Sequence, residues 1–389
     1  MKAVGIVAEY NPFHNGHLHH VTETKKITGL PVIAIMSGSL CQRGEPAFLN
    51  KWHRSRLAVE NGVDLVLELP TVFTTRSAEY FAKGAIDILA AIGCVSTLSC
   101  GAENPSFDFA TLARIMTSSK FQQALQTELK CGKSYAAACA QLLQAHTGST
   151  AQLNTPNDIL ALEYSKALLK HDIKPIFMQR TDNGYNSPEI EGSIASATAI
   201  RTDYTSHGLL WQQAVPPSVK SFIIQNSAGY DEALLWQLIS YRLRLLSPQA
   251  IAERSQCSEG MENLLKQTAG CSTLSEALTA ASQKRYPTSR LRRTLLQLLL
   301  DRPRSYYEQS TAAYIRVLAF NDTGRQLLKE MKKCAQLPII TKLGKNPTYG
   351  QSTEFAQQME LDIAAAELLS FLQSSSVGID YTTSPAYIK

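Results

Sequence analysis

The sequence predicts a doubly wound α/β domain with a parallel sheet, followed by a mainly α-helical region. In the first half, short and almost wholly apolar runs alternate with segments of helical periodicity, which is typical of a parallel sheet covered on both faces. After about residue 206 these runs stop, and Leu, Arg, Gln and Ala recur with helical spacing over residues 230–333. A chain of 389 residues that is 44% hydrophobic is long enough for two or three domains with a real core.

The first half predicts five strands and the helices between them. The expected strands are the apolar runs 2–8, 31–36, 64–69, 95–100 and 173–178. Helical periodicity marks segments such as 50–61 and 78–92. No good strand lies between about 106 and 170. We therefore expect a helical insertion there, with one helix opening at Pro156-Asn157-Asp158.

The second half is expected to be helical up to a short irregular stretch. Residues 337–353 contain Pro, Gly and Asn and predict loops or a small extended element. An amphipathic helix is expected near 355–373, followed by a frayed tail. We therefore divide the chain into an α/β domain over 1–205, with the helical insertion at about 106–170, and a mainly helical, basic region over 206–389.

Composition excludes several classes of protein. A charged content of 18% beside 44% hydrophobic residues excludes a disordered chain. No apolar run approaches ~18 residues, so no membrane-spanning helix is expected, and the apolar start of the chain is too short for a signal peptide. The eight cysteines include no CxxC pair, which predicts reduced thiols. We expect a cytoplasmic protein.

Charge is unevenly distributed along the chain. Residues 1–205 hold 18 Lys and Arg against 18 Asp and Glu, whereas residues 206–389 hold 20 against 15 and carry the whole net charge of +5. Within 284–333 there are 12 basic and 4 acidic residues. Such a footprint is typical of a site for a polyanion, but a solvated helical surface gives the same count. Both interpretations stay open from charge alone.

The clearest motif follows the first expected strand. It reads His14-Asn15-Gly16-His17 and stands after an Asn-Pro-Phe turn, at the start of a helix. A helix N-terminus offers free N–H groups and a positive dipole end, both suited to phosphate. Histidines three residues apart share one helix face, where they can stabilise charge that builds up in nucleotidyl transfer. The alternative is a metal site from His14, His17, His19 and His20. It lacks paired Cys or acidic ligands, and we predict no metal.

A second motif follows the last expected strand. Residues 193–201 read SIASATAIR, which places two hydroxyl residues and an arginine at a helix N-terminus. Ser196, Thr198 and Arg201 are suited to the β- and γ-phosphates, because the guanidinium forms a natural fork for phosphate oxygens. The plainer interpretation is an ordinary Ser/Thr N-cap.

Together these motifs resemble those of a known superfamily. His14-Asn15-Gly16-His17 resembles the HxGH signature of the HIGH-type nucleotidyltransferases, and 193–201 resembles their Ser-Ser-Thr-x-Ile-Arg motif, with Ala197 in place of a serine. Further segments make the chain similar to the bacterial tRNA(Met) cytidine acetate ligase family, from residue 2 to about 345. These segments are 36–38, 42–47, 51–52, 62–70, 78–82, 101–103, 156–160, 284–293 and 314–318.

The resemblance implies an activity. Members of the family use ATP and acetate to acetylate the wobble cytidine of elongator tRNA(Met), which gives N4-acetylcytidine through acetyl-adenylate, AMP and pyrophosphate. ATP is then a substrate, with Mg²⁺ as the default companion ion. A small-molecule adenylyltransferase or pantoate-type ligase would use the same HxGH site, but it would not need ~180 further residues with a basic stretch. A non-catalytic RNA-binding protein has no reason to keep both signatures in matching places.

The resemblance also implies site residues. The family's ATP site corresponds to Val7, Ala8, Glu9, Tyr10, Asn11, Pro12, Phe13, His14, Asn15, Gly16, His17, Leu18, His19, His20, Gly101, Asn157, Arg180, Ser196, Thr198 and Arg201. Within it, His14 and His17 are the expected catalytic residues, acting on the α-phosphate. Asn157 either binds a sugar or base or caps a helix.

Other charged residues carry weaker expectations. Arg43, Lys51 and Arg54 either help to hold ATP or an RNA phosphate or lie on a solvated helix face. Glu9 and Asp64 stand near strand ends, and neither receives a catalytic role. For tRNA, the best candidates are the basic residues Lys284, Arg285, Arg290, Arg292 and Arg293, with solubility and intramolecular ion pairs as the alternative role. Tyr286, Tyr306 and Tyr307 are available for base stacking, but nothing in the sequence singles them out.

Overall fold

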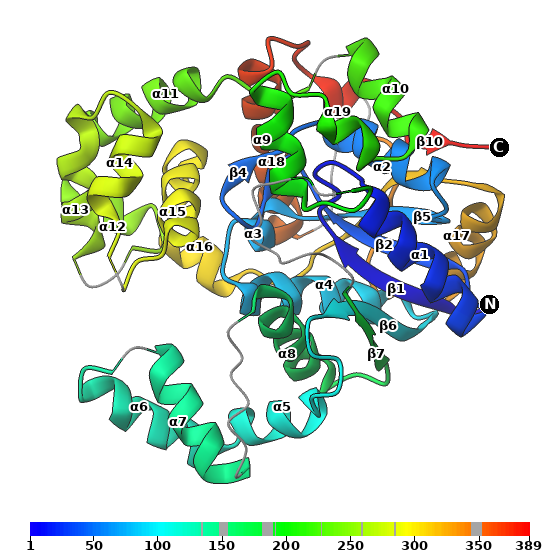
Figure 1. The fold of residues 1–389 in the computed structure, drawn as a ribbon, viewed down its shortest axis with the longest axis horizontal. Coiled ribbons are helices and arrows are strands. Elements are labelled where there is room, and N and C mark those ends of the chain that lie inside the picture. Colours follow the sequence, from blue (N-terminus) through cyan, green and yellow to red (C-terminus); the bar gives the residue numbers. More distant parts are fainter. Residues whose placement is uncertain are drawn as a thin grey trace.

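The computed structural model describes residues 1–133, 135–147, 155–180, 190, 192–226, 228–257, 260–283, 285–343 and 352–389. A central sheet organises these residues, with helices on both faces (Figure 1). Its strands are β1 (Ala3–Ala8), β2 (Val32–Ser37), β5 (Leu65–Leu69), β6 (Val95–Ala102), β7 (Lys174–Gln179), β8 (Ile315–Phe320), β9 (Ile339–Ile340) and β10 (Ala386–Tyr387). They lie in the order β10-β8-β5-β2-β1-β6-β7, with β9 beside β8.

The five strands expected from the sequence form the parallel part of this sheet. β1 pairs with β2 on one side and with β6 on the other, β2 pairs with β5, and β6 pairs with β7, all in parallel. Each expected strand lies within two residues of an observed one. The doubly wound α/β prediction is therefore confirmed. The strand order reverses at β1, so the topological switch point lies between β1 and β6, where open α/β sheets bind their ligands.

The sheet is buried on both faces, as its apolar strands require. Along β2, Val32, Ala34 and Met36 point to one face, and Ile33 and Ile35 point to the other. The first face is covered by α1 (Asn15–Thr28), α2 (Lys51–Glu60), α9 (Ala197–Thr205) and α10 (Pro217–Asn226). The second face is covered by α4 (Ala78–Ile92), α8 (Pro156–Leu168) and α17 (Asp322–Cys334).

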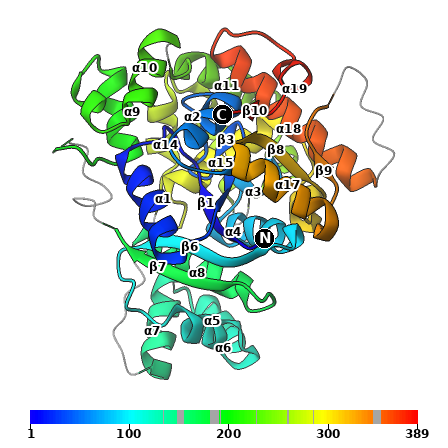
Figure 2. The ribbon, with the colours of Figure 1, turned by 90° about the vertical axis from the view of Figure 1, so that its right-hand side faces the viewer.

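The segment between β6 and β7 holds helices. These are α5 (Phe109–Thr117), α6 (Ser119–Lys130), α7 (Tyr135–Thr147) and α8. They share a small core of their own, in which Phe109 and Phe121 pack with Leu162 of α8. Figures 1 and 2 show α5, α6 and α7 projecting from the sheet beyond α8.

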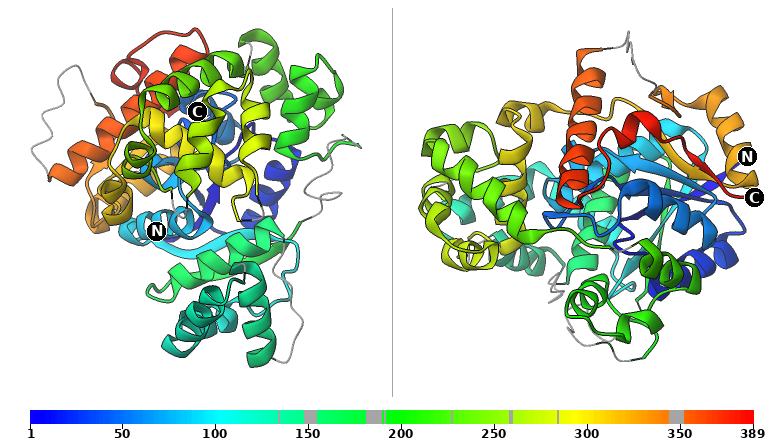
Figure 3. Two further views of the ribbon diagram at one scale, coloured as in Figure 1. Left: turned by 90° about the vertical axis from the view of Figure 1, so that its left-hand side faces the viewer. Right: turned by 90° about the horizontal axis from the view of Figure 1, so that it is seen from above.

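A second group of helices lies at the other end of the molecule. It contains α11 (Glu232–Leu245), α12 (Pro248–Glu253), α13 (Met261–Gln267), α14 (Leu274–Ala281), α15 (Thr288–Leu300) and α16 (Arg304–Gln309), with α18 (Thr353–Leu372) between it and the sheet. Figure 3 shows this group on the side of the sheet away from both termini. Leu295 of α15 and Trp236 of α11 belong to the same core as Ile33 of β2. The helical group therefore packs continuously onto the sheet.

Two expectations about the second half are wrong. The six residues of β8 lie inside the stretch 230–333 that was expected to be helical, and they pair antiparallel with β5. A six-residue apolar run is short beside the Leu- and Arg-rich helices that surround it, so the helical periodicity of the whole stretch conceals it. The expected frayed tail instead forms α19 (Ile379–Thr382) and β10. The boundary at residue 205 stays a prediction, since the sheet takes strands from both halves.

None of the eight cysteines forms a disulfide. Among the described residues, no helix combines the length and the apolar character that a membrane crossing needs.

Candidate functional site

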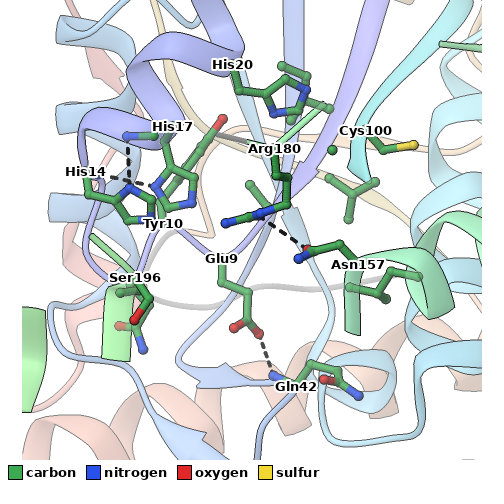
Figure 4. Close-up of a pocket in the computed structure, with 18 of the residues that line it drawn as sticks. Glu9, Tyr10, His14, His17, His20, Gln42, Cys100, Asn157, Arg180 and Ser196 are labelled. Atoms are coloured by element: carbon green, nitrogen blue, oxygen red, sulfur yellow. Dashed lines mark hydrogen bonds between the residues drawn. The ribbon is translucent and has the colours of Figure 1, made fainter. Parts of the chain in front are cut away.

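A cavity of about 220 Å³ opens at the carboxyl ends of β1 and β6. Its walls come from α1, α8, α9 and the loop that joins the short strands β3 (Leu40–Cys41) and β4 (Glu45–Pro46). This is the topological switch point of the sheet, so the fold alone marks it as a ligand site. Figure 4 shows the side chains that converge on it.

The N-terminus of α1 is built from the two motif histidines. His14 is the N-cap, and its Nδ1 accepts a hydrogen bond from the Gly16 N–H at 3.1 Å. Nδ1 of His17 accepts from the His14 N–H at 3.2 Å, which completes a capping box. The two ring centroids lie 3.7 Å apart, with the ring planes tilted by 31°. The spacing of three residues therefore caps the helix and aligns both rings at once.

This cap fixes the protonation of the rings. A ring nitrogen that accepts a hydrogen bond carries no proton, so a neutral His14 or His17 carries its proton on Nε2. Burial, and then the nearby His14 and Arg180, hold the pKa of His17 well below 6.5. His17 is therefore neutral near pH 7 and has an Nε2–H to donate. The arrangement can stabilise negative charge on a phosphate without adding a full positive charge.

The turn that leads into α1 is held by long-range contacts. Tyr10 lies in the left-handed region, with φ of 47°, and the Asn11 side chain accepts from the Phe48 N–H at 2.7 Å. Arg54 is fully buried and donates to the backbone carbonyls of Leu49, Glu9, Ser37 and Gly38. Arg54 thus ties the ends of β1 and β2 together.

Lys51 and Arg54 were expected either to hold ATP or an RNA phosphate or to lie on a solvated helix face, and both expectations are wrong. Neither side chain is on a solvated face, and neither faces the cavity. Lys51 is only 1% exposed and pairs with Glu68 at 2.7 Å and with Asp380 at 2.8 Å. Arg43, the third residue of that expectation, does line the cavity.

A second helix N-terminus faces the same cavity. Ser196 is the N-cap of α9 and accepts from the Ala199 N–H at 3.1 Å, so its hydroxyl serves the cap. Thr198 accepts from Arg43 Nη1 at 3.3 Å. Arg201 donates to the Asn11 carbonyl at 2.8 Å and pairs with Glu45 at 2.7 Å. The positive ends of α1 and α9 thus converge on one space, which suits a polyphosphate.

The opposite wall joins the turn after β6 to the start of α8. Asn157 donates to Glu103 at 2.6 Å. The buried Asp158 carboxylate accepts from the N–H groups of Glu103 and Asn104. Arg180, just after β7, donates to Asn157 at 3.4 Å (Figure 4). This reciprocal set keeps the Asn157 side chain and the Arg180 guanidinium at the cavity.

Glu9 lies in the middle of the cavity, between the histidines and Asn157 (Figure 4). One carboxylate oxygen accepts from the Gln42 N–H at 2.6 Å. Burial raises the pKa of Glu9 above 4.5, and the Gln42 N–H and the cations Arg43, Arg201 and Arg54 act against that rise. The sequence analysis included Glu9 in the ATP site but assigned it no catalytic role, and a contact across 33 residues gives no local signal.

The cavity gathers most of the ATP-site residues expected from the sequence. The ones that line it are Val7, Ala8, Glu9, Tyr10, Asn11, His14, Gly16, His17, His19, His20, Gly101, Asn157, Arg180, Ser196, Thr198 and Arg201. Pro12, Phe13, Asn15 and Leu18 lie outside its lining. Asn15 instead holds the carbonyls of Ser193 and Gln213.

Sequence reasoning missed part of the lining. Those side chains are Cys41, Gln42, Glu45, Phe81, Cys100, Leu160, Tyr164, Met178 and Gln179. Several of them stand at strand ends or in the segments that carry the family resemblance, and this position along the chain could have identified them as candidates. Their direction into the cavity was not readable, because it depends on the pleat and on packing between distant elements.

The described basic residues that were expected to bind tRNA have different surroundings. Lys284 lies outside the described residues. Arg285 is exposed in the turn before α15, and the Arg290 guanidinium lies 5.5 Å from the Tyr286 ring. Arg293 donates to the Gln42 carbonyl at 2.9 Å, and Arg292 lies 3.8 Å from Glu45. Their role toward tRNA stays a prediction.

The N-terminal part of α15 lies directly against the β3–β4 loop. A Cβ on Gly44, whose φ is +80°, would come within 2.5 Å of the Arg293 backbone nitrogen. Only glycine fits this close approach and this backbone conformation. The helical group therefore reaches the cavity through the β3–β4 loop.

Comparisons with known proteins agree with this geometry. The model of the HIGH Nucleotidyl Transferase family matches residues 1–381. The chain is 36% identical to the tRNA(Met) cytidine acetate ligase of Leuconostoc mesenteroides, over all of this chain and 99% of that protein. It is also 36% identical to the protein of the same name from Alkaliphilus metalliredigens, with the same coverage.

Solved structures give the same result. The crystal structure of apo Thermotoga maritima TmcAL has a TM-score of 0.92 to this chain and is 31% identical, with both chains fully covered. The same protein bound with alpha-thio ATP has a TM-score of 0.90 and is 30% identical, over all of this chain and 99% of that one.

Proposed function

The chain belongs to the tRNA(Met) cytidine acetate ligase family within the HIGH nucleotidyl transferases, and we propose that it activates acetate with ATP and transfers the acetyl group to the wobble cytidine of elongator tRNA(Met). The product is N4-acetylcytidine, and ATP is cleaved to AMP and pyrophosphate. The observation that carries the proposal is the cavity where the capped N-termini of α1 and α9 converge. A reaction on tRNA places the enzyme in the cytoplasm.

In the first half-reaction, an acetate oxygen attacks the α-phosphorus of ATP and pyrophosphate leaves. His14 and His17 donate their Nε2–H groups to the α-phosphate, where negative charge builds up. Backbone N–H groups of α9, with Thr198 and Arg201, hold the β- and γ-phosphates. Arg201 must then exchange its Glu45 partner for phosphate oxygens. Catalysis consists of positioning and charge stabilisation, as is general for transfer at phosphorus.

Mg²⁺ enters this scheme with its substrate. Among the described residues, no three His, Cys, Asp or Glu side chains come together in a way that would hold a metal ion. The ion's ligands would therefore be phosphate oxygens and water, as is usual for Mg²⁺ with a nucleotide.

In the second half-reaction, the cytidine N4 amine attacks the acetyl carbonyl and AMP leaves. We propose that the anticodon approaches the cavity from the side of α15, with Arg285 and Arg290 contacting RNA phosphates near the β3–β4 loop. Phosphate contacts of this kind supply affinity that falls steeply with salt.

A labelling experiment tests the proposal. The protein is incubated with ATP, Mg²⁺, radiolabelled acetate and bulk bacterial tRNA, and the RNA is digested to nucleosides. We expect label in N4-acetylcytidine that depends on ATP, and tRNA depleted of the elongator species is the matched control. Acetate-stimulated pyrophosphate release without label on RNA would remove the tRNA substrate from the proposal. No signal of either kind would leave a small-molecule adenylyltransferase as the better interpretation.

A further inference from the structure

This inference rests on the proposed function, and it concerns the proton that the second half-reaction must release. Acetate is ionised at neutral pH, so its attack on ATP needs no base. The cytidine amine, in contrast, keeps an N–H proton that must leave as the C–N bond forms. The cavity should therefore hold one group that accepts a proton close to the acetyl carbonyl.

Most titratable groups that line the cavity are unsuited to this task. His14 and His17 use Nδ1 as the acceptor that caps α1, so in the neutral rings Nε2 carries the proton and is a donor. His20 contacts Ser99 at 2.9 Å, and burial lowers its pKa to about 4, which makes it a weak base. Burial also raises the pKa of the Tyr10 hydroxyl and that of the Cys41 thiol, so neither group is ionised near neutrality. Burial raises the pKa of Cys100 and of Tyr164 in the same way, and the His19 side chain is exposed.

Two carboxylates also line the cavity among the described residues. Glu45 is engaged by Arg201 at 2.7 Å and has Arg292 at 3.8 Å. Glu9 uses one oxygen to accept the Gln42 N–H, and part of its surface is open to the cavity. Figure 4 places the Glu9 carboxylate between the histidine face and the loop that carries Gln42.

Glu9 also lies on the side from which the RNA would arrive. Gln42 donates its N–H to Glu9 and accepts from Arg293 of α15 at its carbonyl, at 2.9 Å. Gln42 therefore bridges Glu9 and α15, the helix from whose side we propose that the tRNA approaches. We propose that Glu9 is the general base of acetyl transfer, accepting the proton of the cytidine N4 amine on its free carboxylate oxygen.

The atoms balance in this step. The N4 lone pair forms a bond to the acetyl carbon, and the bond between that carbon and the phosphate oxygen of acetyl-adenylate breaks. The electron pair leaves with AMP. The proton moves from N4 to Glu9 and then to solvent.

The groups around Glu9 shift its pKa in opposite directions. They come from five regions: Cys41 and Arg43 beside Gln42, Arg54 of α2, Tyr164 of α8, Arg201 of α9 and Arg293 of α15. Burial raises the pKa of Glu9 and makes its carboxylate a stronger base. The surrounding arginines favour the ionised form and limit that rise. Transfer should therefore become faster as pH increases through the Glu9 pKa.

The experiment measures the transfer step alone, in a single turnover with synthetic acetyl-adenylate and elongator tRNA(Met), between pH 5 and pH 8. The variant is Glu9→Gln, which keeps an oxygen for the Gln42 N–H but cannot accept the proton. We expect its transfer rate constant to fall by about 100-fold or more and to lose its dependence on pH. Glu45→Gln, the same change in the other carboxylate, should lower the transfer rate constant less than 10-fold.

A second variant and a second assay distinguish a catalytic role of Glu9 from a structural role and from a role in ATP binding. Glu9→Asp keeps a base, and recovery of a pH-dependent rate above that of Glu9→Gln would exclude a purely structural role. Transfer by Glu9→Gln within threefold of wild type would overturn the inference. Equal losses in acetate-dependent ATP–pyrophosphate exchange and in transfer, with a raised KM for ATP, would also overturn it, because Glu9 would then hold the ribose. Absence of transfer by the wild type would instead refute the proposed function itself.

Discussion

Two clusters of charged side chains lie at the same edge of the sheet and differ in almost every other respect. In the cavity, Arg43, Arg180 and Arg201 surround an open space. Next to it, Lys51 and Arg316 meet Glu68 and Asp380 in a closed cluster in which no side chain is more than 2% exposed. The Trp52 indole also donates to Asp380 at 3.1 Å.

The difference shows how the same residue types serve stability in one place and ligand binding in another. In the closed cluster each charge has lost its water and must be matched by a partner, so removing one member leaves another buried and uncompensated. In the cavity the cations keep partners, such as Glu45, that a phosphate can replace. We therefore expect mutations in the closed cluster to change folding and mutations in the cavity to change catalysis.

The largest effect should come from breaking the closed cluster. Lys51→Met should lower the free energy of unfolding by about 3–5 kcal/mol, because Glu68 and Asp380 would share a single remaining cation, Arg316. Urea denaturation measures this loss. The control is Lys83→Met, which breaks an exposed pair with Asp87 and should cost no more than about 0.5 kcal/mol. Equal losses in the two variants would contradict the distinction between the clusters.

The next effect should appear in catalysis with little change in folding. His17→Ala should reduce acetate-dependent ATP–pyrophosphate exchange by about 10²–10³-fold, as expected when one donor to a developing negative charge is lost. The free energy of unfolding should fall by only about 1 kcal/mol, through the lost helix cap. His171→Ala, on the far edge of the sheet, is the matched control and should stay within twofold of wild type. A large loss of stability in His17→Ala would show that the histidine is mainly structural.

The pH dependence of stability tests the charge state of a histidine in the cavity, His20, which burial keeps uncharged. The pKa of His20 is lowered from 6.5 to about 4 by burial, with smaller contributions from Arg180 and His19. Between these values the unfolded chain binds a proton that the folded chain does not, so the free energy of unfolding decreases as pH falls below 6.5. At pH 5 this loss is up to about 2 kcal/mol.

His20→Gln isolates that contribution, because glutamine can still contact Ser99 but does not titrate. Relative to wild type, the variant should gain stability as pH falls from 6.5 to 5, and the difference between the two proteins cancels contributions from other groups. Burial, for example, raises the pKa of Glu68 to about 7, which acts with the opposite sign. Parallel stability curves for the two proteins would show that His20 is protonated in the folded state.

The smallest effect concerns the exchangeable pair. Glu45→Gln should tighten ATP binding by about 3–10-fold, or about 1 kcal/mol, because it frees Arg201 and removes a negative charge near the triphosphate. Isothermal titration calorimetry measures the Kd. Glu60→Gln, which breaks an exposed pair with Arg56, should leave the Kd unchanged. Weaker ATP binding in Glu45→Gln would mean that Glu45 orients Arg201 for the nucleotide.

The sequence predicted the parallel sheet well, because its strands are buried on both faces and read as apolar runs. It also located both helix N-termini of the cavity, since HxGH and the Ser/Thr motif follow strand ends. It did not predict β8, whose Arg316 is buried among partners from the rest of the chain. It placed Lys51 and Arg54 wrongly, because a basic residue on a helix gives no local sign that a distant carboxylate or carbonyl will bury it. Nor can sequence spacing show which ring nitrogen of His14 or His17 faces the ligand.

The closed cluster also has a consequence for how a ribosome makes this protein. Lys51 and Asp380, which lie 2.8 Å apart, are separated by 329 positions in the chain. At roughly 5–20 residues per second, synthesis takes from about 16 s to about 1 min to pass from one to the other. Once residue 201 has been made, the nascent chain contains every described residue that lines the cavity, but β5 still lacks its β8 neighbour and Lys51 still lacks Asp380. Completion of the sheet therefore waits for translation of residues far beyond the two motifs that line the cavity.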